Sequence, residues 1–153
     1  QDYLIKAGLK TRVMSPFAIQ QVCETYSQYK AIEALENGEA VIIPCGVGYP
    51  YFSTDTGMML RAAELKCDCA LAAKNVDGIY DKDPNKYPDA KKYDALTYEE
   101  ALNKNLKALD AAASAIGMEN DIKVLAFALE TPENITSAIK GENIGTILSN
   151  EKI

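Results

Sequence analysis

The sequence predicts an α/β fold in which a mostly parallel sheet carries helices on both of its faces. Short apolar runs that suit buried strands alternate with segments of helical periodicity along the 153 residues. Serine, threonine or aspartate precedes most of the helical segments, and glycine follows several of them. The length permits one domain, which we expect to span residues 1–153.

The first third of the chain is divided by caps and glycines. Its opening is typical of the last turns of a helix that stops at Gly8, and Ser15-Pro16 places a cap before a proline at the first helical position. We expect, in order, the end of a helix over residues 1–8, a strand over 10–14, a helix beginning at Ser15-Pro16, and a helix from Ser27 to Asn37-Gly38.

The middle third alternates apolar runs with one amphipathic segment. Thr54 and Asp55 begin a helix whose apolar positions recur at helical spacing. Runs this short and this apolar suit strands buried in a sheet. We expect a buried strand over 40–44, a helix with Met58, Met59, Ala62 and Leu65 facing inward, a buried strand over 67–73, and a loop over 81–92.

The last third opens on a capping box. Thr97 and Glu100 have the spacing at which each side chain reaches the other's backbone N–H, so a helix should run from there toward Lys107. Asp110 can cap the small-residue helix that follows. The remaining expected elements are a strand over 122–129, a helix from Thr131-Pro132 to Gly141, and a strand over 145–148.

Composition excludes several classes of function. Hydrophobic residues make up 48% and charged residues 25%, as in ordinary globular proteins. The net charge of −6 argues against a nucleic-acid partner, although a mononucleotide needs only a few local donors. No apolar run approaches the ~20 residues of a membrane span, and no signal-peptide pattern opens the chain. We therefore expect a cytoplasmic protein.

The four cysteines lie at positions 23, 45, 67 and 69. Cys67-x-Cys69 could suggest a pair of metal ligands, because alternate residues of a strand share a face. The sequence has no histidine and no second close cysteine pair, so a zinc site is weakly supported. Buried free thiols in a reducing compartment are the better interpretation.

Residues 44–55, PCGVGYPYFSTD, join a strand end, a glycine turn and a helix start. Backbone N–H groups can converge on an anion at such a place. The pattern is neither Gly-x-Gly-x-x-Gly nor a Walker A loop, so neither a dinucleotide fold nor a P-loop fold is indicated. By itself the stretch is equally compatible with an ordinary structural connection.

Two further stretches carry polar residues in suggestive positions. Residues 74–84 read KNVDGIYDKDP, with Asp77-Gly78 as a strong turn dipeptide, and residues 109–114 read LDAAAS. Exposed tyrosine and aspartate are common in turns, and Asp110 could be a helix cap and nothing more.

Taken together and in this order, the three stretches resemble the amino acid kinase family and, within it, the bacterial UMP kinases. The run from Val76 to Pro84 is shared across that family, whereas Phe52-Ser-Thr-Asp followed by Leu109-Asp points to the UMP kinases. Leu60-Arg-Ala-Ala-Glu, Leu96-Thr-Tyr-Glu-Glu and Gly141-Glu-Asn-Ile-Gly-Thr-Ile also match, and the resemblance extends from Gln1 to about Leu148.

The resemblance implies an amino acid kinase-like sandwich and transfer of the γ-phosphate of ATP to UMP, with magnesium, in pyrimidine nucleotide biosynthesis. It implies a homohexamer and a possible GTP effector, with Arg12 at the effector site. Glu39 stands where some relatives carry another basic residue, which disfavours GTP activation.

The resemblance also assigns residues to roles. Asp110 is expected to be catalytic, by orienting a phosphate-binding lysine or the magnesium ion. Asn75, Tyr80 and Asp83 are expected to contact ATP, although Lys74 could instead meet a phosphate. The expected UMP-binding loop comprises Val47, Gly48, Tyr49, Pro50, Tyr51, Phe52, Ser53 and Thr54. At positions 47 and 49 this chain has valine and tyrosine, where the family usually has threonine and asparagine.

Two alternatives stay open. The chain could be another amino acid kinase that acts on a carboxylate such as glutamate, or a non-catalytic nucleotide-binding or storage homologue. The opening resembles the middle of a helix, and in the family a segment with phosphate-gripping glycines and a lysine would precede it. The chain is therefore expected to be truncated at its N-terminus and to lack kinase activity by itself.

Overall fold

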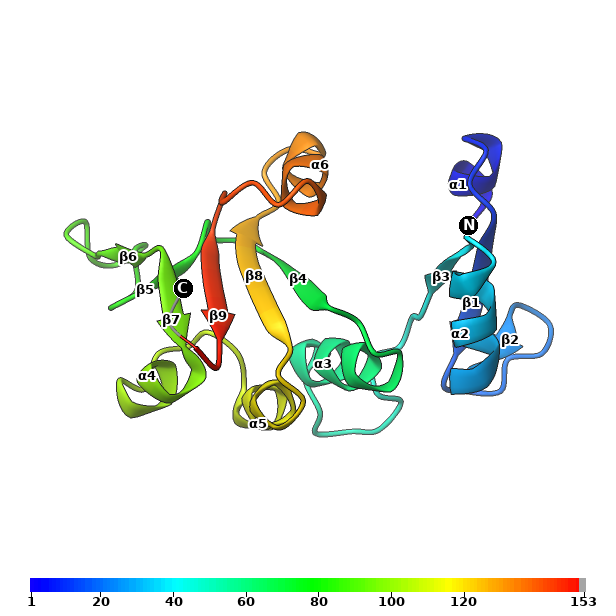
Figure 1. The fold of residues 1–153 in the computed structure, drawn as a ribbon, viewed down its shortest axis with the longest axis horizontal. Coiled ribbons are helices and arrows are strands. Elements are labelled where there is room, and N and C mark those ends of the chain that lie inside the picture. The colour runs from blue at the N-terminus through cyan, green and yellow to red at the C-terminus, as the bar shows by residue number, and fades with distance from the viewer. Residues whose placement is uncertain (152–153) are drawn as a thin grey trace.

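The computed structural model describes residues 1–151. Its elements alternate between helices and strands along most of the chain (Figure 1). The helices are α1 (Asp2–Lys6), α2 (Gln28–Glu36), α3 (Thr54–Glu64), α4 (Tyr98–Asn103), α5 (Ala111–Glu119) and α6 (Glu133–Ile139). The strands are β1 (Thr11–Ser15), β2 (Glu24–Thr25), β3 (Ala40–Ile42), β4 (Cys69–Lys74), β5 (Ile79–Tyr80), β6 (Lys92–Tyr93), β7 (Ala95–Thr97), β8 (Lys123–Ala128) and β9 (Thr146–Ser149).

The first part of the chain forms a small parallel sheet. Its strand order is β2-β1-β3, and helices α1 and α2 lie beside it (Figure 1, right). Each crossover between parallel strands needs an intervening segment, and the one between β1 and β3 contains β2 and α2.

The larger sheet has the order β4-β8-β9-β7. Strand β4 pairs with β8 in parallel, β7 pairs with β9 in parallel, and only β8 and β9 are antiparallel. Helices α3, α4 and α5 lie along one side of this sheet and α6 along the other (Figure 1). The predicted α/β class, with parallel-rich sheets and helices on both faces, is therefore confirmed.

The core lies between the larger sheet and its helices. Met59 of α3, Leu96 of β7, Val124 of β8 and Leu148 of β9 are at most 2% exposed. Tyr98 is 1% exposed, and its hydroxyl donates to the Ile122 carbonyl over 2.7 Å. A buried phenol needs such a partner, because an unpaired buried hydroxyl is costly.

Local signals predicted the helix ends well. Gly8 and Gly38, with φ of +89° and +72°, follow α1 and α2 as expected. Thr97 and Glu100 make both hydrogen bonds of the capping box, and Asp110 caps α5. Helix α4 ends at Asn103, earlier than predicted, because Asn105 takes a left-handed conformation with φ of 52°.

Two expectations about the strands and helices were wrong. No helix begins at Ser15-Pro16, because Ser15 is the last residue of β1 and its hydroxyl accepts the Phe17 N–H in a local turn. Strand β3 is only half-buried, although the run 40–44 was expected to be buried.

The thiols were also misjudged. The four cysteines are free, but Cys45, Cys67 and Cys69 are exposed and Cys23 is half-buried. The expected strand over 67–73 begins only at Cys69, which lies on the edge strand of the larger sheet, and Cys67 precedes that strand.

Within residues 1–151, no helix combines the length and apolar character that crossing a membrane requires.

The capping box provides a test of the fold. Thr97→Ala should lower the free energy of unfolding by about 1 kcal/mol, because the Glu100 N–H at the start of α4 loses its acceptor. Ser27→Ala is the matched control, since Ser27 stands at the N-cap of α2 without making a side-chain cap bond. Denaturant unfolding should show the larger loss for Thr97→Ala, and equal losses would contradict the assignment.

Candidate functional site

Three chain segments meet at the carboxyl ends of the parallel strands. These are the start of α3, the end of β4 at Lys74, and the start of α5 at Asp110. In open α/β sheets, ligands bind outside the carboxyl ends of the strands, where helix N-termini also point. This convergence is the candidate site.

Asp110 joins the two helix starts. Its Oδ1 accepts the Ala113 N–H over 3.0 Å, which caps α5. The Thr56 hydroxyl donates to both carboxylate oxygens at 2.9 and 3.0 Å, and the Ser53 hydroxyl donates to Oδ2. Asp110 is thus both a helix cap and the tie between α5 and α3, which lie 54 residues apart in sequence.

These hydrogen bonds stabilise the ionised form of Asp110. Partial burial by itself would raise the pKa of this carboxyl, but the donors from Ser53, the Ala113 amide and Thr56 outweigh it. The pKa is therefore held below its usual value. Asp110 stays negatively charged at neutral pH.

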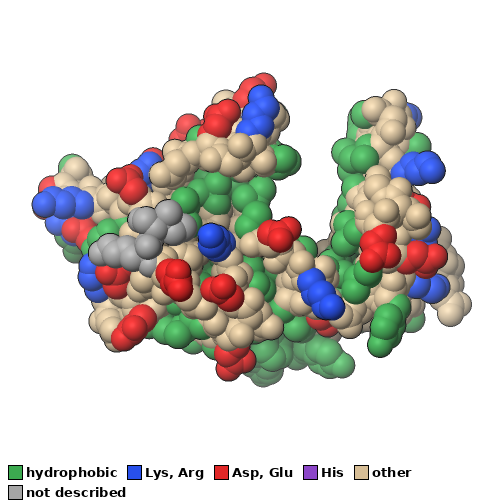
Figure 2. Space-filling model, viewed as in Figure 1, with side chains coloured by type: hydrophobic (Ala, Val, Ile, Leu, Met, Phe, Trp, Pro, Cys, Tyr) green, Lys and Arg blue, Asp and Glu red, His purple; other side chains and the backbone are tan. Residues whose placement is uncertain are grey.

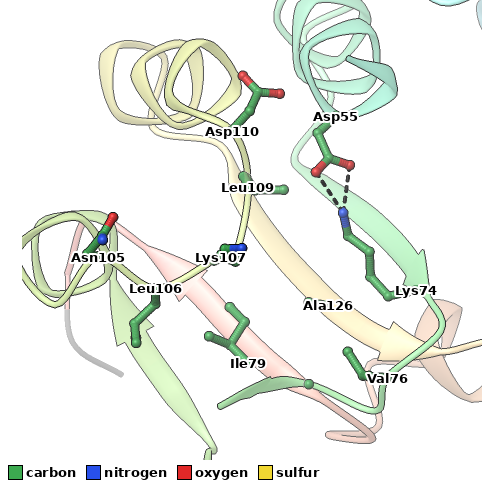
Figure 3. A pocket seen from close by; sticks show the side chains of 12 residues that line it. Asp55, Lys74, Val76, Ile79, Asn105, Leu106, Lys107, Leu109, Asp110 and Ala126 are labelled. Carbon is green, nitrogen blue, oxygen red and sulfur yellow. Dashed lines mark hydrogen bonds and ion pairs between the residues drawn. The ribbon is translucent and has the colours of Figure 1, made fainter. Parts of the chain in front are cut away.

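A second charged pair lies beside Asp110. Lys74 Nζ, at the end of β4, contacts both carboxylate oxygens of Asp55 at 2.6 and 2.7 Å. The two side chains are 28% and 24% exposed, so solvent screens the pair less than an open surface pair. Figure 3 shows Lys74 and Asp55 pointing toward each other, with Asp110 on the neighbouring helix start.

A cavity of about 400 Å³ opens over these residues. Its charged side chains come from Asp55, Lys74, Lys107 and Asp110, and apolar residues such as Leu109 complete the wall (Figure 3). Paired cations and carboxylates beside helix N-termini can bind and orient a phosphate group.

A second cavity, of about 420 Å³, adjoins the first and shares part of its wall, including Ile79, Leu106 and Lys107. Tyr80 and Asp83 line it, as expected for one ligand site. The Tyr80 hydroxyl donates to Asp77, which raises the pKa of Tyr80, and Lys92 also contacts Asp77. These contacts hold the tyrosine ring at the cavity wall.

The hairpin that forms this wall is anchored from β9. The buried Thr146 hydroxyl accepts the Ile79 N–H over 2.8 Å and donates to the Tyr93 carbonyl. Gly78 allows this approach, because a Cβ there would lie 2.6 Å from the Thr146 hydroxyl oxygen. The wall of the second cavity therefore depends on a residue 67 positions away.

The other expected ligand residues lie apart from both cavities. Asn75 is exposed and lines neither of them. The loop over residues 47–52 is also outside them, with Tyr49, Tyr51 and Phe52 at 73%, 104% and 54% exposed.

The loop is nevertheless fixed at both ends. Gly48 has φ of +87°, and a Cβ at this position would lie 2.9 Å from the Pro16 side chain. Ser53 caps α3 by accepting the Thr56 N–H over 3.1 Å, and Thr54 is exposed on the first helical turn. The loop therefore leads directly into the Ser53–Asp110 contact.

The sequence did not assign Asp55, Thr56 or Lys107 to the site, and it left open whether Lys74 contacts a phosphate. The available signal was positional: Lys74 ends a strand and Asp55 lies in the first turn of a helix. That these two positions meet depends on the packing of α3 beside β4, which no local pattern encodes.

Arg12, the expected effector residue, is occupied by a partner within the chain. Its Nε and one terminal nitrogen donate to the two Glu39 carboxylate oxygens at 2.7 and 3.3 Å. This hydrogen-bonded pair raises the pKa of Arg12 and lowers the pKa of Glu39. An incoming anion would have to compete with Glu39 for the guanidinium group.

The family model described as the amino acid kinase family matches residues 1–127. The chain belongs to the amino acid kinase family. This agrees with the motif-based expectation, and it accounts for the parallel-rich α/β architecture around the site.

Solved structures of family members are similar over almost the whole chain. A UMP kinase from Ureaplasma parvum is 36% identical with a TM-score of 0.90, and one from Bacillus anthracis is 30% identical with a TM-score of 0.91. Each match covers 97% of this chain. A uridylate kinase from Archaeoglobus fulgidus is 32% identical over 80% of this chain, with a TM-score of 0.67.

The chain spans only part of these amino acid kinases. It covers 63% of the Ureaplasma chain, 61% of the Bacillus chain and 58% of the Archaeoglobus chain.

The hydrogen-bonded state of Asp110 predicts a pH dependence. Its pKa is lower in the folded than in the unfolded chain, so the ionised carboxylate stabilises the fold above the unfolded-state pKa. This contribution is lost as the pH falls through the folded-state value, below about pH 4. Asp110→Asn, which can still cap α5, should show a shallower loss of stability in that range. Denaturant unfolding from pH 7 to pH 3 gives the free energy of unfolding of the original protein and of the variant. An equal decrease in both would contradict the prediction.

Proposed function

We propose that the protein containing this chain is a UMP kinase that transfers the γ-phosphate of ATP to UMP, giving ADP and UDP. The observation that carries the proposal is the Lys74–Asp55 pair beside Asp110, in a cavity that continues into a second one of similar size. Family membership supports a kinase, and similarity to UMP kinases supports the choice of acceptor.

In the reaction, a phosphate oxygen of UMP forms a bond to the γ-phosphorus as the bond to the bridging oxygen of ADP breaks. The acceptor is already an anion, so no strong general base is required, and a chain without histidine can support the step. Catalysis therefore depends on positioning the anionic ATP and UMP and on neutralising the charge of their phosphates.

Lys74 supplies the positive charge. Its ammonium group meets the transferring phosphate, and Asp55 holds that group in place from the first turn of α3. Asp55, rather than Asp110, is the carboxylate that contacts Lys74.

Asp110 acts by fixing the two helix starts relative to each other. Its bonds to Ser53 and Thr56 set where the N–H groups of α3 and α5 point. Those N–H groups carry the positive end of each helix dipole, which favours phosphate.

The two nucleotides are assigned to different sides of the site. ATP is placed in the second cavity, with Tyr80 offering its ring to the base and Asp83 its carboxylate to the ribose hydroxyls. UMP is placed at the loop over residues 47–54, which ends at the Ser53–Asp110 contact. Val47 and Tyr49 alter the polar contacts that this loop offers. Asn75 stays assigned to ATP by resemblance.

The chain's own carboxylates do not fit a dedicated magnesium site. Within residues 1–151, no cluster of three or more histidine, cysteine or acidic side chains could hold a metal ion. Both Asp110 oxygens accept hydrogen bonds, and Asp55 is paired with Lys74. Magnesium is therefore proposed to enter on the phosphates of ATP, as part of the substrate.

The regulation and the oligomeric state of the protein are predicted from the family resemblance alone. A homohexamer is proposed for the whole protein. GTP activation through Arg12 is disfavoured, because Glu39 engages the guanidinium group through both carboxylate oxygens.

An acceptor panel tests the proposed function. The protein that contains this chain should form ADP from ATP with UMP, more slowly with CMP, and not with glutamate. Asp110→Asn should reduce turnover by about a hundredfold or more while the protein still folds at a modestly lower melting temperature, because the carboxylate sets where the N–H groups of α3 and α5 point. Turnover with glutamate alone would establish the carboxylate-kinase alternative, and nucleotide binding without turnover would establish the non-catalytic one.

The acceptor loop provides a second test. Thr54→Ala should weaken UMP binding by roughly 1.5–3 kcal/mol and leave ATP binding intact, because it removes a hydrogen bond to a charged phosphate. Thr25→Ala is the control, since Thr25 is an exposed threonine on β2. Calorimetry with each nucleotide would show equal losses for ATP and UMP if Thr54 were not in the acceptor site.

A further inference from the structure

One lysine at the candidate site has no partner within the described chain. Four lysines line the two cavities in residues 1–151, and three of them form ion pairs with carboxylates. The pairs are Lys74–Asp55 at 2.6 Å, Lys82–Asp89 at 2.6 Å and Lys86–Asp83 at 3.7 Å. The ammonium group of the fourth, Lys107, forms neither an ion pair nor a hydrogen bond with another described residue. Its charge is therefore available to a bound anion.

Lys107 also lies where the two cavities meet. It lines both of them, together with Asn105 and Leu106, on the segment that joins α4 to α5 (Figure 3). The first cavity includes Asp110 in its wall, and the second includes Tyr80. A ligand that extends from one cavity into the other therefore passes along the wall to which Lys107 belongs.

The backbone on either side of Lys107 is held in place. Asn105 takes the left-handed conformation, with φ of 52°, and the Leu106 N–H donates to the Ala101 carbonyl over 2.9 Å. These are the features of a Schellman motif, which ends α4 and sets the direction in which the chain leaves it. Leu106 and Ala108, the two neighbours of Lys107, pack against the core. The lysine side chain thus begins at a fixed position beside both cavities.

The chain as a whole does not attract a polyphosphate. Its net charge is −6, and on the face that Figure 2 draws the basic side chains are interspersed with acidic ones rather than gathered in one patch. In the first cavity Asp55 neutralises Lys74, so Asp110 would leave a net negative charge without Lys107. A single cation at short range therefore has a large effect on whether a polyphosphate binds there.

We propose that Lys107 binds the β-phosphate of the nucleoside triphosphate and neutralises the charge that collects on it during transfer. The inference rests on the proposed function, which places the base and ribose in the second cavity and the transferring phosphate beside Lys74. In the nucleotide the β-phosphate lies between these two parts, just as Lys107 lies between the two cavities.

The charge develops because of how the bonds change. An oxygen of UMP gives an electron pair to the γ-phosphorus, and the oxygen that bridges the β- and γ-phosphorus atoms keeps the electron pair of the bond that breaks. The added negative charge stays on the β-phosphate of ADP, where an ammonium group stabilises it without giving up a proton.

The two lysines of the first cavity act on different phosphates. Lys74 is held by Asp55 and stays with the transferred group. Lys107 has no such restraint in the described chain, and a lysine is a compact charge on a flexible stem. It can therefore remain with the diphosphate as the bond to the γ-phosphorus lengthens.

Binding of ADP and AMP to the whole protein tests the β-phosphate contact. Lys107→Gln should weaken ADP binding by about tenfold or more, because a charge-assisted hydrogen bond is lost, and should leave AMP binding unchanged. Lys107→Arg should retain most of the ADP affinity. Lys123→Gln is the matched control and should change neither affinity, since Lys123 is exposed at the amino end of β8. Calorimetry measures each affinity, and thermal unfolding checks that the variants fold.

Turnover provides the second measurement. With ATP and UMP, Lys107→Gln should lower kcat by about a hundredfold and leave the KM for UMP nearly unchanged, because the lost charge acts on the leaving group rather than on the acceptor. If the original protein does not phosphorylate UMP, the proposed function is wrong. The comparison of ADP with AMP needs no turnover, so it still tests Lys107.

Several results would overturn the inference. These are equal losses of ADP and AMP affinity in Lys107→Gln, no loss of either, or the same loss of ADP affinity in Lys123→Gln. An unchanged kcat in Lys107→Gln would also contradict it. If Lys74→Gln removed the preference for ADP over AMP and Lys107→Gln did not, the β-phosphate contact would belong to Lys74 instead.

Discussion

The arrangement around the site depends on one carboxylate. Asp110 accepts hydrogen bonds from the first turn of its own helix and from Ser53 and Thr56 at the start of α3. Because α3 leads into β4 and α5 leads into β8, which are neighbours in the larger sheet, this contact sets how the helices pack on that sheet and where their N–H groups converge. Removing it would leave two helix starts with no side-chain link between them. The ion pair of Lys74 with Asp55 depends on the same placement, since Asp55 belongs to the turn that Thr56 anchors.

Much of the fold could be predicted because its signals are local. Each of these signals depends only on residues within about four positions of it in the sequence. They are the capping box at Thr97, the cap at Asp110 and the left-handed glycines after α1 and α2. Expectations failed where the outcome depends on pairing between distant segments. Ser15-Pro16 has the residue types of a helix start, but Ser15 pairs in parallel with Thr25 as part of a strand. Cys69 lies in an apolar run that suits a buried strand, yet its strand is the edge of a sheet.

The site residues show the same difference between local motifs and contacts that depend on long-range packing. Asp110, Tyr80 and Asp83 could be selected from motifs, and the structure places each of them at a cavity wall. Lys74 and Asp55 could not be joined from the sequence, because 19 residues and a change of element separate them. Resemblance gave Asp110 the role of orienting a phosphate-binding lysine or the magnesium ion, and that role stays a prediction; in this structure Asp55, not Asp110, contacts Lys74. The difference is one of helix position: Asp55 lies in the first turn beyond the cap, where its side chain reaches β4, and Asp110 is itself a cap.

The hydroxyl of Thr146 has a consequence for the order of folding. A chain synthesised from its N-terminus completes the hairpin of β5 and β6 long before Thr146 exists, and the Ile79 N–H has no strand to bind until β9 docks. The wall of the second cavity is therefore completed only after β9 has been synthesised. Until then a two-stranded hairpin must persist unsupported, and isolated hairpins are marginally stable. Competence to bind a ligand there is thus coupled to completion of the C-terminal strand, although β9 itself contributes no residue to the cavity.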